Sequence, residues 1–325
     1  MTKVDIRLVV RDYDHVAPLA CGDITAEGIH LHLDRKTSML RFVSDPSFQA
    51  GEMSFSQYLI RLSRGDRSFV GLPVFVMRVF RHRGFYVVRD SGMQSLQALE
   101  GKRVGTNGWA DTGNTWARAA IREQGLGIDQ IDWVVGPVDD PSYDSFGHRP
   151  QLRLPDNVAP CAPGRTLREM LLKGELDALM CPWPPAGFYD PGCPIVRLIA
   201  NYRRVEQEYA RRVGYYPAHH IVAVRREVFD RDPWIASSLY QALERSRIQS
   251  QRNRRSLADT TPWLLADIEE TSELLGDDWQ PNGVGPNQKM IQALCDEELE
   301  QGLIESPLDS AQVFEEFEAA SSGLS

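Results

Sequence analysis

Short strand-like runs alternate with helical patterns along the first two thirds of this 325-residue chain, and this alternation is the strongest constraint on its fold. Runs rich in apolar and β-branched residues predict strands at residues 4–10, 28–33, 74–80, 84–89, 176–180 and 221–224, and residues 99–105 are predicted to form a turn into a short strand. Apolar residues spaced three or four apart predict helices at residues 54–64, 116–124 and 166–173. Strands alternating with helices favour an α/β architecture with parallel sheets.

From Pro233 onward the pattern is almost entirely helical. Helices are predicted at residues 233–256, 262–275, 286–302 and 309–319. A chain of this length is typical of about two domains, each able to bury its own core. The sequence therefore predicts an α/β body with a helical C-terminal tail.

Charge and cysteine usage exclude several classes of protein. The net charge is −9, from 36 Lys and Arg against 45 Asp and Glu, which argues against nucleic acid as the main partner. No apolar run approaches the ~20 residues of a membrane span, and charges interrupt the N-terminal segment, so we expect no membrane partner and a cytoplasmic location. The five cysteines contain no C-x-x-C pair, so we expect neither a disulfide framework nor a structural zinc site.

Several common catalytic motifs are absent from the sequence. It contains no Walker loop, no Rossmann glycine fingerprint, no G-x-S-x-G elbow and no H-E-x-x-H helix. Their absence argues against nucleotide-driven, α/β-hydrolase and zincin chemistry. The candidate functional residues must therefore come from other clusters.

One such cluster is a basic run between two predicted strands, formed by Arg78, Arg81, His82 and Arg83. An Arg side chain presents a planar fork that matches a carboxylate, so this run is suited to bind a dicarboxylate. The alternative is a solvated basic turn.

A second anion-binding candidate is Thr112-Gly113, at the predicted start of a helix. The free N–H groups and the positive dipole end of a helix favour an anion there, and the Thr hydroxyl adds a donor. The alternative is an ordinary helix cap.

Two histidine pairs are candidates for proton transfer or metal binding. Side chains of adjacent residues on a strand point to opposite faces, so at most one of His219 and His220 faces a given site. That histidine could shuttle protons, and the alternative is a structural, hydrogen-bonded histidine. His30 and His32 share one strand face and resemble a metal-binding pair, but no third ligand is evident from the spacing. The alternative for that pair is an ordinary surface strand.

Three further polar residues lie near predicted strand ends, where α/β sheets bind ligands. Asp14 follows the first strand, Glu52 lies just before the helix at 54–64, and Ser54 stands at its start. Ser54 either caps that helix or faces a substrate.

Several stretches match a known family in order and spacing over nearly the whole chain. The more specific ones are Glu52-Met53-Ser54, Arg78 with Phe80-Arg81-His82, and the C-terminal set Pro262-Trp263, Gly276-Asp277-Asp278, Asn287 and Glu300–Leu303. Further matches are Asp12-Tyr13-Asp14, Pro217 with His220, Pro233-Trp234, and two stretches that are weak alone, Lys102–Gly105 and Gly174–Ala178. With these residues the chain resembles the 4,5-dihydroxyphthalate decarboxylase family.

This resemblance implies a two-lobed type II periplasmic-binding-protein-like fold with a ligand cleft between the lobes. The implied lobe I comprises residues 1–88 and 221–325, and lobe II comprises residues 89–220. The resemblance further implies that the cleft is locally positive although the chain is acidic.

The activity implied is non-oxidative decarboxylation of a hydroxylated aromatic acid such as 4,5-dihydroxyphthalate. The residues expected to carry it are His82 or His220 as proton donor, Asp14 or Glu52 to polarise a hydroxyl, Arg78 and Arg81 as carboxylate anchors, and Ser54, Thr112 and Gly113 as further substrate-binding residues. No organic cofactor is expected, a divalent metal is compatible with the chemistry, and so is a homo-oligomer.

The alternative function is a non-catalytic solute-binding or ligand-sensing protein for a small aromatic or carboxylate ligand, because a fold does not determine a function. An exported binding protein needs a leader or a lipobox cysteine, and neither is seen here. An enzyme of the thiamine-precursor type on the same fold is less favoured, because the sequence has no Cys- and His-rich metal run.

Overall fold

The computed structural model of the chain describes residues 3–36, 42–143 and 153–322. The chain divides into two compact units. The first unit comprises Met1–Val79, Gly214–Cys295 and Pro307–Ser325, and the second comprises Phe80–Val213 and Asp296–Ser306.

These boundaries differ from the expected ones in three segments. Residues 80–88 and 296–306 belong to the second unit and residues 214–220 to the first. The first unit's strand β4 (Phe69–Arg78) already ends before residue 88, and its strand β11 (Ala218–Arg225) already begins before residue 221. The last turn of α9 (Gln288–Glu300) and the segment after it join the second unit, where the Arg118 guanidinium donates a 2.7 Å hydrogen bond to the side chain of Gln301.

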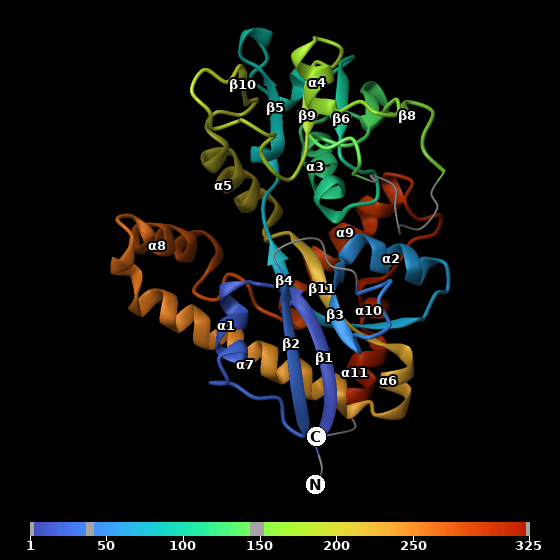
Figure 1. The fold of residues 1–325 in the computed structure, drawn as a ribbon, viewed down its shortest axis with the longest axis vertical. Coiled ribbons are helices and arrows are strands. Elements are labelled where there is room, and N and C mark those ends of the chain that lie inside the picture. The colour runs from blue at the N-terminus through green and yellow to red at the C-terminus, as the bar shows by residue number, and fades with distance from the viewer. Residues whose placement is uncertain (1–2, 37–41, 144–152, 323–325) are drawn as a thin grey trace. The chain divides into compact units, whose positions relative to one another are not determined.

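The first unit contains a mixed five-stranded sheet (Figure 1). In spatial order the strands are β2 (Ile29–Lys36), β1 (Val4–Arg11), β3 (Ala50–Ser54), β11 and β4. β1 pairs in parallel with β2 and β3, whereas β11 is antiparallel to both β3 and β4. The expected parallel sheet is therefore corrected to a mixed one, because β11 returns through the sheet in the opposite direction. The carboxyl ends of β1, β3 and β4 consequently lie at the same edge as the amino end of β11.

Alternation along β1 builds the main core of this unit. Ile6, Leu8 and Val10 point to one face of the sheet and are fully buried. The long helix α7 (Trp234–Ser256) packs on that face, and its Leu239 belongs to the same core cluster (Figure 1). Burial of this apolar face explains why the predicted 233–256 helix forms there.

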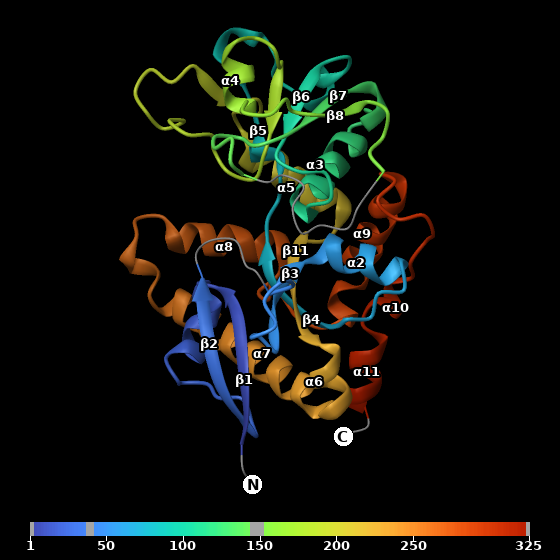
Figure 2. The same cartoon turned by 45° about the vertical axis from the view of Figure 1, so that its right-hand side comes forward.

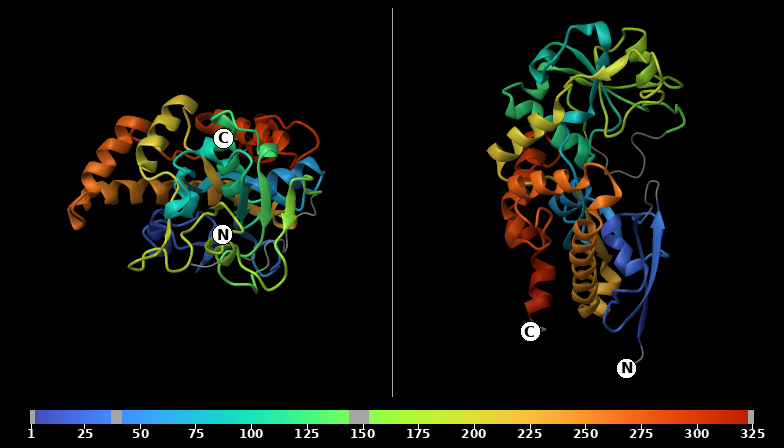
Figure 3. Two further views of the ribbon diagram at one scale, coloured as in Figure 1. Left: turned by 90° about the horizontal axis from the view of Figure 1, so that it is seen from above. Right: turned by 90° about the vertical axis from the view of Figure 1, so that its left-hand side faces the viewer.

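The other helices of the first unit surround the sheet. They are α1 (Ala17–Ala20), α2 (Phe55–Ser63), α6 (Arg226–Arg231), α8 (Leu264–Leu275), most of α9, α10 (Ser310–Val313) and α11 (Glu315–Ser322). α2 packs against β3 and β11 on the face opposite α7. Figure 3 shows α8 folding back after α7 as a helical hairpin. The single helix predicted at 309–319 is divided into α10 and α11, and α6 was not predicted.

The second unit contains a six-stranded mixed sheet (Figure 2). In spatial order its strands are β10 (Ile195–Arg197), β5 (Phe85–Val88), β9 (Ala178–Met180), β6 (Arg103–Thr106), β7 (Asp132–Val135) and β8 (Val158–Pro160). β9, β6, β7 and β8 run parallel, whereas β5 is antiparallel to β9 and to β10. Its main helices are α3 (Thr112–Glu123), α4 (Leu167–Leu172) and the unpredicted α5 (Tyr202–Val213). Leu167 and Leu171 of α4 pack on the sheet in one apolar cluster.

In the part of the chain that the structure describes, no helix combines the length and the apolar character that crossing a membrane requires. All five cysteines are free thiols. Cys181 and Cys295 are buried, and Cys21 is exposed.

Candidate functional site

The strand ends of the first unit's sheet bring a carboxylate, an imidazole and a phenol together. The side chain of Glu52, on β3, is completely buried. Its Oε1 accepts a hydrogen bond from the Tyr13 hydroxyl at 2.7 Å, and its Oε2 accepts one from the backbone N–H of Arg11 at 2.8 Å. The Nδ1–H of His220 also donates to Oε1. Glu52 is therefore a buried carboxylate with three donors.

These partners determine the charge state of the cluster. Burial by itself raises the pKa of the Glu52 carboxyl, but the hydrogen bonds from His220, Arg11 and Tyr13 outweigh it and lower that pKa below its usual value. Glu52 is thus ionised at neutral pH. Burial and the adjacent Glu52 carboxylate raise the pKa of the Tyr13 hydroxyl far above its usual value, so Tyr13 stays a donor.

His220 is placed by strand pairing. On β11 it lies opposite Ser54 of β3 and is paired with Met77 of β4. Its side chain is 21% exposed, and among the described residues its Nε2 has no hydrogen-bond partner. With Nδ1–H held by a carboxylate, Nε2 is the atom able to take up and release a proton.

The neighbouring His219 points to the other face of β11, as the alternation of a strand predicts. It is fully buried, and its Nε2 forms a 2.8 Å hydrogen bond with the carbonyl oxygen of Val79. Of the two adjacent histidines, only His220 belongs to the Glu52 cluster.

Arg78, a predicted carboxylate anchor, is held by acceptors of its own unit. Its guanidinium donates to the carbonyl oxygens of Tyr216 and Pro281, each at 2.8 Å, and to Oδ1 of Asn287 at 2.6 Å. Burial lowers the pKa of Arg78 to about 10. These contacts join the end of β4 to the segment before α9, and the role of Arg78 toward a substrate stays a prediction.

Asp14 and Ser54 also make contacts within the first unit. Asp14 pairs with Arg254 of α7, and Nδ1 of His15 lies 3.6 Å from its carboxylate. The neighbouring His15 imidazole and the charge of Arg254 hold the pKa of Asp14 well below its usual range. Ser54 caps α2 by accepting a 3.5 Å hydrogen bond from the backbone N–H of Gln57. Substrate roles for Asp14 and Ser54 stay predictions.

In the second unit, the structure brings Arg81 together with the start of α3. A Cβ atom at Gly113 would lie 2.7 Å from a terminal nitrogen of the Arg81 guanidinium, so a side chain there would displace that guanidinium. Thr112 is the first helical residue and Asp111 is the cap position, so the alternative of an ordinary cap at Thr112 is wrong. Arg81 and Thr112 are both buried. A guanidinium and a helix N-terminus at one place both favour a bound anion.

His82 differs from His220 in its surroundings. It is 1% exposed, and neither ring nitrogen has a hydrogen-bond partner among the described residues. Its ring packs edge-on against Tyr209 of α5, with centroids 5.0 Å apart. Burial lowers the pKa of His82 to about 4, so its imidazole is neutral at neutral pH.

This burial predicts a pH dependence of stability. Unfolding returns His82 to its usual pKa of 6.5, so between pH 6.5 and 4 the unfolded chain binds the extra proton and the native state loses stability as the pH falls. We expect the free energy of unfolding of the wild type to drop by about 2 kcal/mol more than that of His82→Phe between about pH 7 and about pH 5. Urea denaturation at both pH values measures this difference. Equal drops in the two proteins would contradict the assignment.

The sequence did not predict the role of Arg11 or the contact between Glu52 and His220. The one feature that pointed to these residues was their place at strand ends, since Arg11 ends β1 and Glu52 lies near the end of β3. No spacing predicts that His220, 168 residues away, lies beside Glu52.

One other group of polar side chains has the geometry of a metal site. Among the described residues, Asp5, His30 and His32 alone place three potential ligand atoms of His, Cys, Asp or Glu within 4.8 Å of one another. They lie on β1 and β2, away from the strand ends that carry Glu52 and His220.

Comparison with known proteins agrees with the resemblance seen in the sequence. No family model matches the chain. It is 28% identical over 324 residues to the 4,5-dihydroxyphthalate decarboxylase of Comamonas testosteroni, with 97% of both chains covered. The Pseudomonas putida decarboxylase of the same name is 29% identical over 223 residues, or 66% of this chain and 84% of that one. Two decarboxylases of this name therefore support membership of the chain in the 4,5-dihydroxyphthalate decarboxylase family.

The two decarboxylase homologues support the predicted class of enzyme, a carboxy-lyase. Solved structures confirm the predicted fold. The aliphatic sulphonate binding protein SsuA of Escherichia coli matches 95% of this chain and 96% of its own with a TM-score of 0.53 and 13% identity. A ligand-binding component of an ABC-type import system from Staphylococcus aureus matches 98% of this chain and 99% of its own, with a TM-score of 0.51 and 11% identity. At these identities the likeness shows a periplasmic-binding-protein-like fold alone.

Proposed function

We propose that this decarboxylase acts on a hydroxylated aromatic dicarboxylic acid such as 4,5-dihydroxyphthalate, and that His220 is its proton donor. The observation that carries the proposal is the buried Glu52 carboxylate, which holds Nδ1 of His220 and leaves Nε2 without a protein partner among the described residues. The names of the two relatives support the substrate class.

The substrate itself supplies the electrons for this reaction. In 4,5-dihydroxyphthalate each carboxylate is para to one hydroxyl. As that hydroxyl loses its proton to solvent, its oxygen pushes electron density into the ring, and the ipso carbon takes a proton to give a dearomatised keto intermediate. The C–C bond to the carboxylate then breaks, its electron pair restores the aromatic ring, and CO2 leaves. After CO2 has left, the phenolate oxygen takes a proton back from solvent.

In this scheme protonated His220 donates the proton from Nε2 to the ipso carbon. The ionised Glu52 stabilises the imidazolium before the transfer and fixes the ring orientation throughout. Tyr13 and the backbone N–H of Arg11 keep the carboxylate in place through the other hydrogen bonds. His82 is less suited to this role, because burial keeps it neutral at neutral pH.

We further propose Arg81 as the residue that binds a substrate carboxylate, supported by its place against Gly113 at the start of α3. Because the phenol acts as the electron source, the scheme needs no organic cofactor. A divalent metal remains compatible with it, so the assays are run with added metal and with a chelator.

The test is an incubation of the purified protein with 4,5-dihydroxyphthalate and a panel of hydroxybenzoates in D2O. We expect release of CO2 and formation of 3,4-dihydroxybenzoate carrying one deuterium at the former carboxylate position. Tight binding without turnover across the panel, with and without divalent metal, would reject the enzyme proposal and favour the solute-binding alternative. Turnover of monocarboxylates alone would reject the dicarboxylate specificity.

A further inference from the structure

The exposed face of the β1–β2 pair carries three metal-ligand side chains. His30 and His32 are two residues apart on β2, so their side chains point to the same face. Parallel pairing places Asp5 of β1 directly beside His30 and diagonal to His32. The third ligand, which the spacing of the sequence does not reveal, therefore comes from the neighbouring strand.

The three side chains already converge on one point. Oδ1 of Asp5 lies 2.9 Å from Nδ1 of His30 and 2.7 Å from Nε2 of His32. The two imidazole rings meet edge to face, with centroids 4.5 Å apart. Their side chains are 65% and 49% exposed, and that of Asp5 is 72% exposed, so an ion reaches them from solvent without any opening of the fold.

We propose that Asp5, His30 and His32 form a surface binding site for one divalent transition-metal ion, of which zinc fits best. Two imidazole nitrogens and one carboxylate oxygen are the ligand set that borderline ions such as Zn²⁺, Ni²⁺ and Cu²⁺ bind, whereas Mg²⁺ and Ca²⁺ prefer oxygen alone. Zinc takes these ligands at about 2.0–2.2 Å, so its ligand atoms are about 3.3 Å apart. The observed separations need only a small outward rotation of exposed side chains to reach that value.

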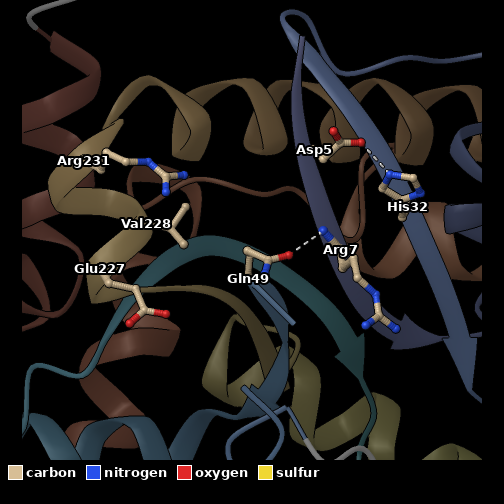
Figure 4. A pocket seen from close by; sticks show the side chains of 7 residues that line it. All are labelled: Asp5, Arg7, His32, Gln49, Glu227, Val228 and Arg231. Atoms are coloured by element: carbon tan, nitrogen blue, oxygen red, sulfur yellow. Dashed lines mark hydrogen bonds and ion pairs between the residues drawn. The ribbon is translucent and has the colours of Figure 1, made fainter. Parts of the chain in front are cut away.

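The surroundings leave room for a fourth ligand. Asp5 and His32 line one wall of an open pocket of about 640 Å³, and Glu227 and Arg231 of α6 lie on the opposite wall (Figure 4). Arg7 is the nearest cation on the same strand, but its guanidinium lies over the ring of Phe48, 4.8 Å from the centroid. A three-ligand site beside an open pocket leaves one coordination position for water or a small anion.

The site is independent of the decarboxylase proposal, because none of its residues belongs to the Glu52–His220 cluster. The test is isothermal titration of the metal-free full-length protein with Zn²⁺, and absorption spectroscopy with Co²⁺ as a visible substitute. We expect the wild type to bind one more equivalent than His30→Ala/His32→Ala and to show the intense bands of four-coordinate Co²⁺, which the double variant loses. Each of the single variants His30→Ala, His32→Ala and Asp5→Asn should raise the dissociation constant of this additional Zn²⁺ equivalent by at least about tenfold.

Asp34→Asn is the matched control, since Asp34 lies on the same strand and its carboxylate pairs with Lys36 instead. It should bind Zn²⁺ as the wild type does. Equal stoichiometry and affinity in the wild type and the double variant would overturn the proposal, and so would a Co²⁺ spectrum that the double variant retains. Turnover by the double variant should match that of the wild type, which separates this result from the test of the decarboxylase.

Discussion

Replacing His220 by alanine is expected to lower kcat for 4,5-dihydroxyphthalate by about 10²- to 10⁴-fold, the usual contribution of a positioned general acid. The physical reason is the loss of the imidazole whose Nδ1 Glu52 holds. The measurement is steady-state kinetics as a function of pH. The loss should fall mainly on kcat, and added imidazole should restore part of the activity.

A matched control removes a different imidazole from the same unit. His30 is exposed on β2 and lies outside the Glu52 cluster, so His30→Ala should keep wild-type kcat. The variant Glu52→Gln keeps the size of the side chain but removes the charge that stabilises the imidazolium. If His220 and Glu52 act as one unit, the double variant should be little worse than His220→Ala alone. Additive losses would show that Glu52 acts independently of His220, and full activity in His220→Ala would show that the proton comes from elsewhere.

Replacing Arg81 by methionine is expected to lower kcat/KM for a dicarboxylate substrate by about 10- to 150-fold, which corresponds to about 1.5–3 kcal/mol for a charge-assisted hydrogen bond. The reason is that Arg81 is buried against Gly113 at the start of α3, where a helix N-terminus also attracts an anion. Methionine retains most of the apolar stem, so packing is changed less than charge. Arg81→Lys should restore only part of the loss, because an ammonium lacks the planar fork.

The exposed Arg83, two residues further along the same basic run, offers the control. Arg83→Met removes the same charge and should leave kcat/KM within about twofold of the wild type, as expected for screened surface charge. A comparison of substrates sharpens the result, since the loss in Arg81→Met should be larger for the dicarboxylate than for a hydroxybenzoate with one carboxylate. Equal losses with both substrates, or equal losses in the Arg81 and Arg83 variants, would argue against a specific carboxylate contact.

Local patterns predicted most of the secondary structure. The alternation of Ile6, Leu8 and Val10 marks β1, and the long helical stretch after Pro233 becomes α7. These predictions succeed because burial of one face imposes a period on neighbouring residues. The α5 helix (Tyr202–Val213) was missed because only Tyr209 and Ala210 of it are buried, so charged residues dominate its pattern.

Topology was predicted less well. The expected parallel sheets are mixed, since β11 runs antiparallel between β3 and β4. Strand direction depends on where the chain re-enters the sheet after a long excursion, and no local period records that. The unit boundaries differ for the same reason, because residues 296–306 join the second unit through contacts such as Gln301 with Arg118.

The sequence by itself determined the ingredients of the chemistry: an acidic chain with a basic Arg-His run, a Thr-Gly helix start, and histidines at alternating strand positions. Only the tertiary structure decided which of them meet. Pairing of β11 with β3 brings His220 to Glu52, and parallel pairing of β1 with β2 brings Asp5 to His30 and His32. The reason is that periodicity assigns a residue to a face of its own strand, whereas its neighbours across the sheet depend on strand order and register.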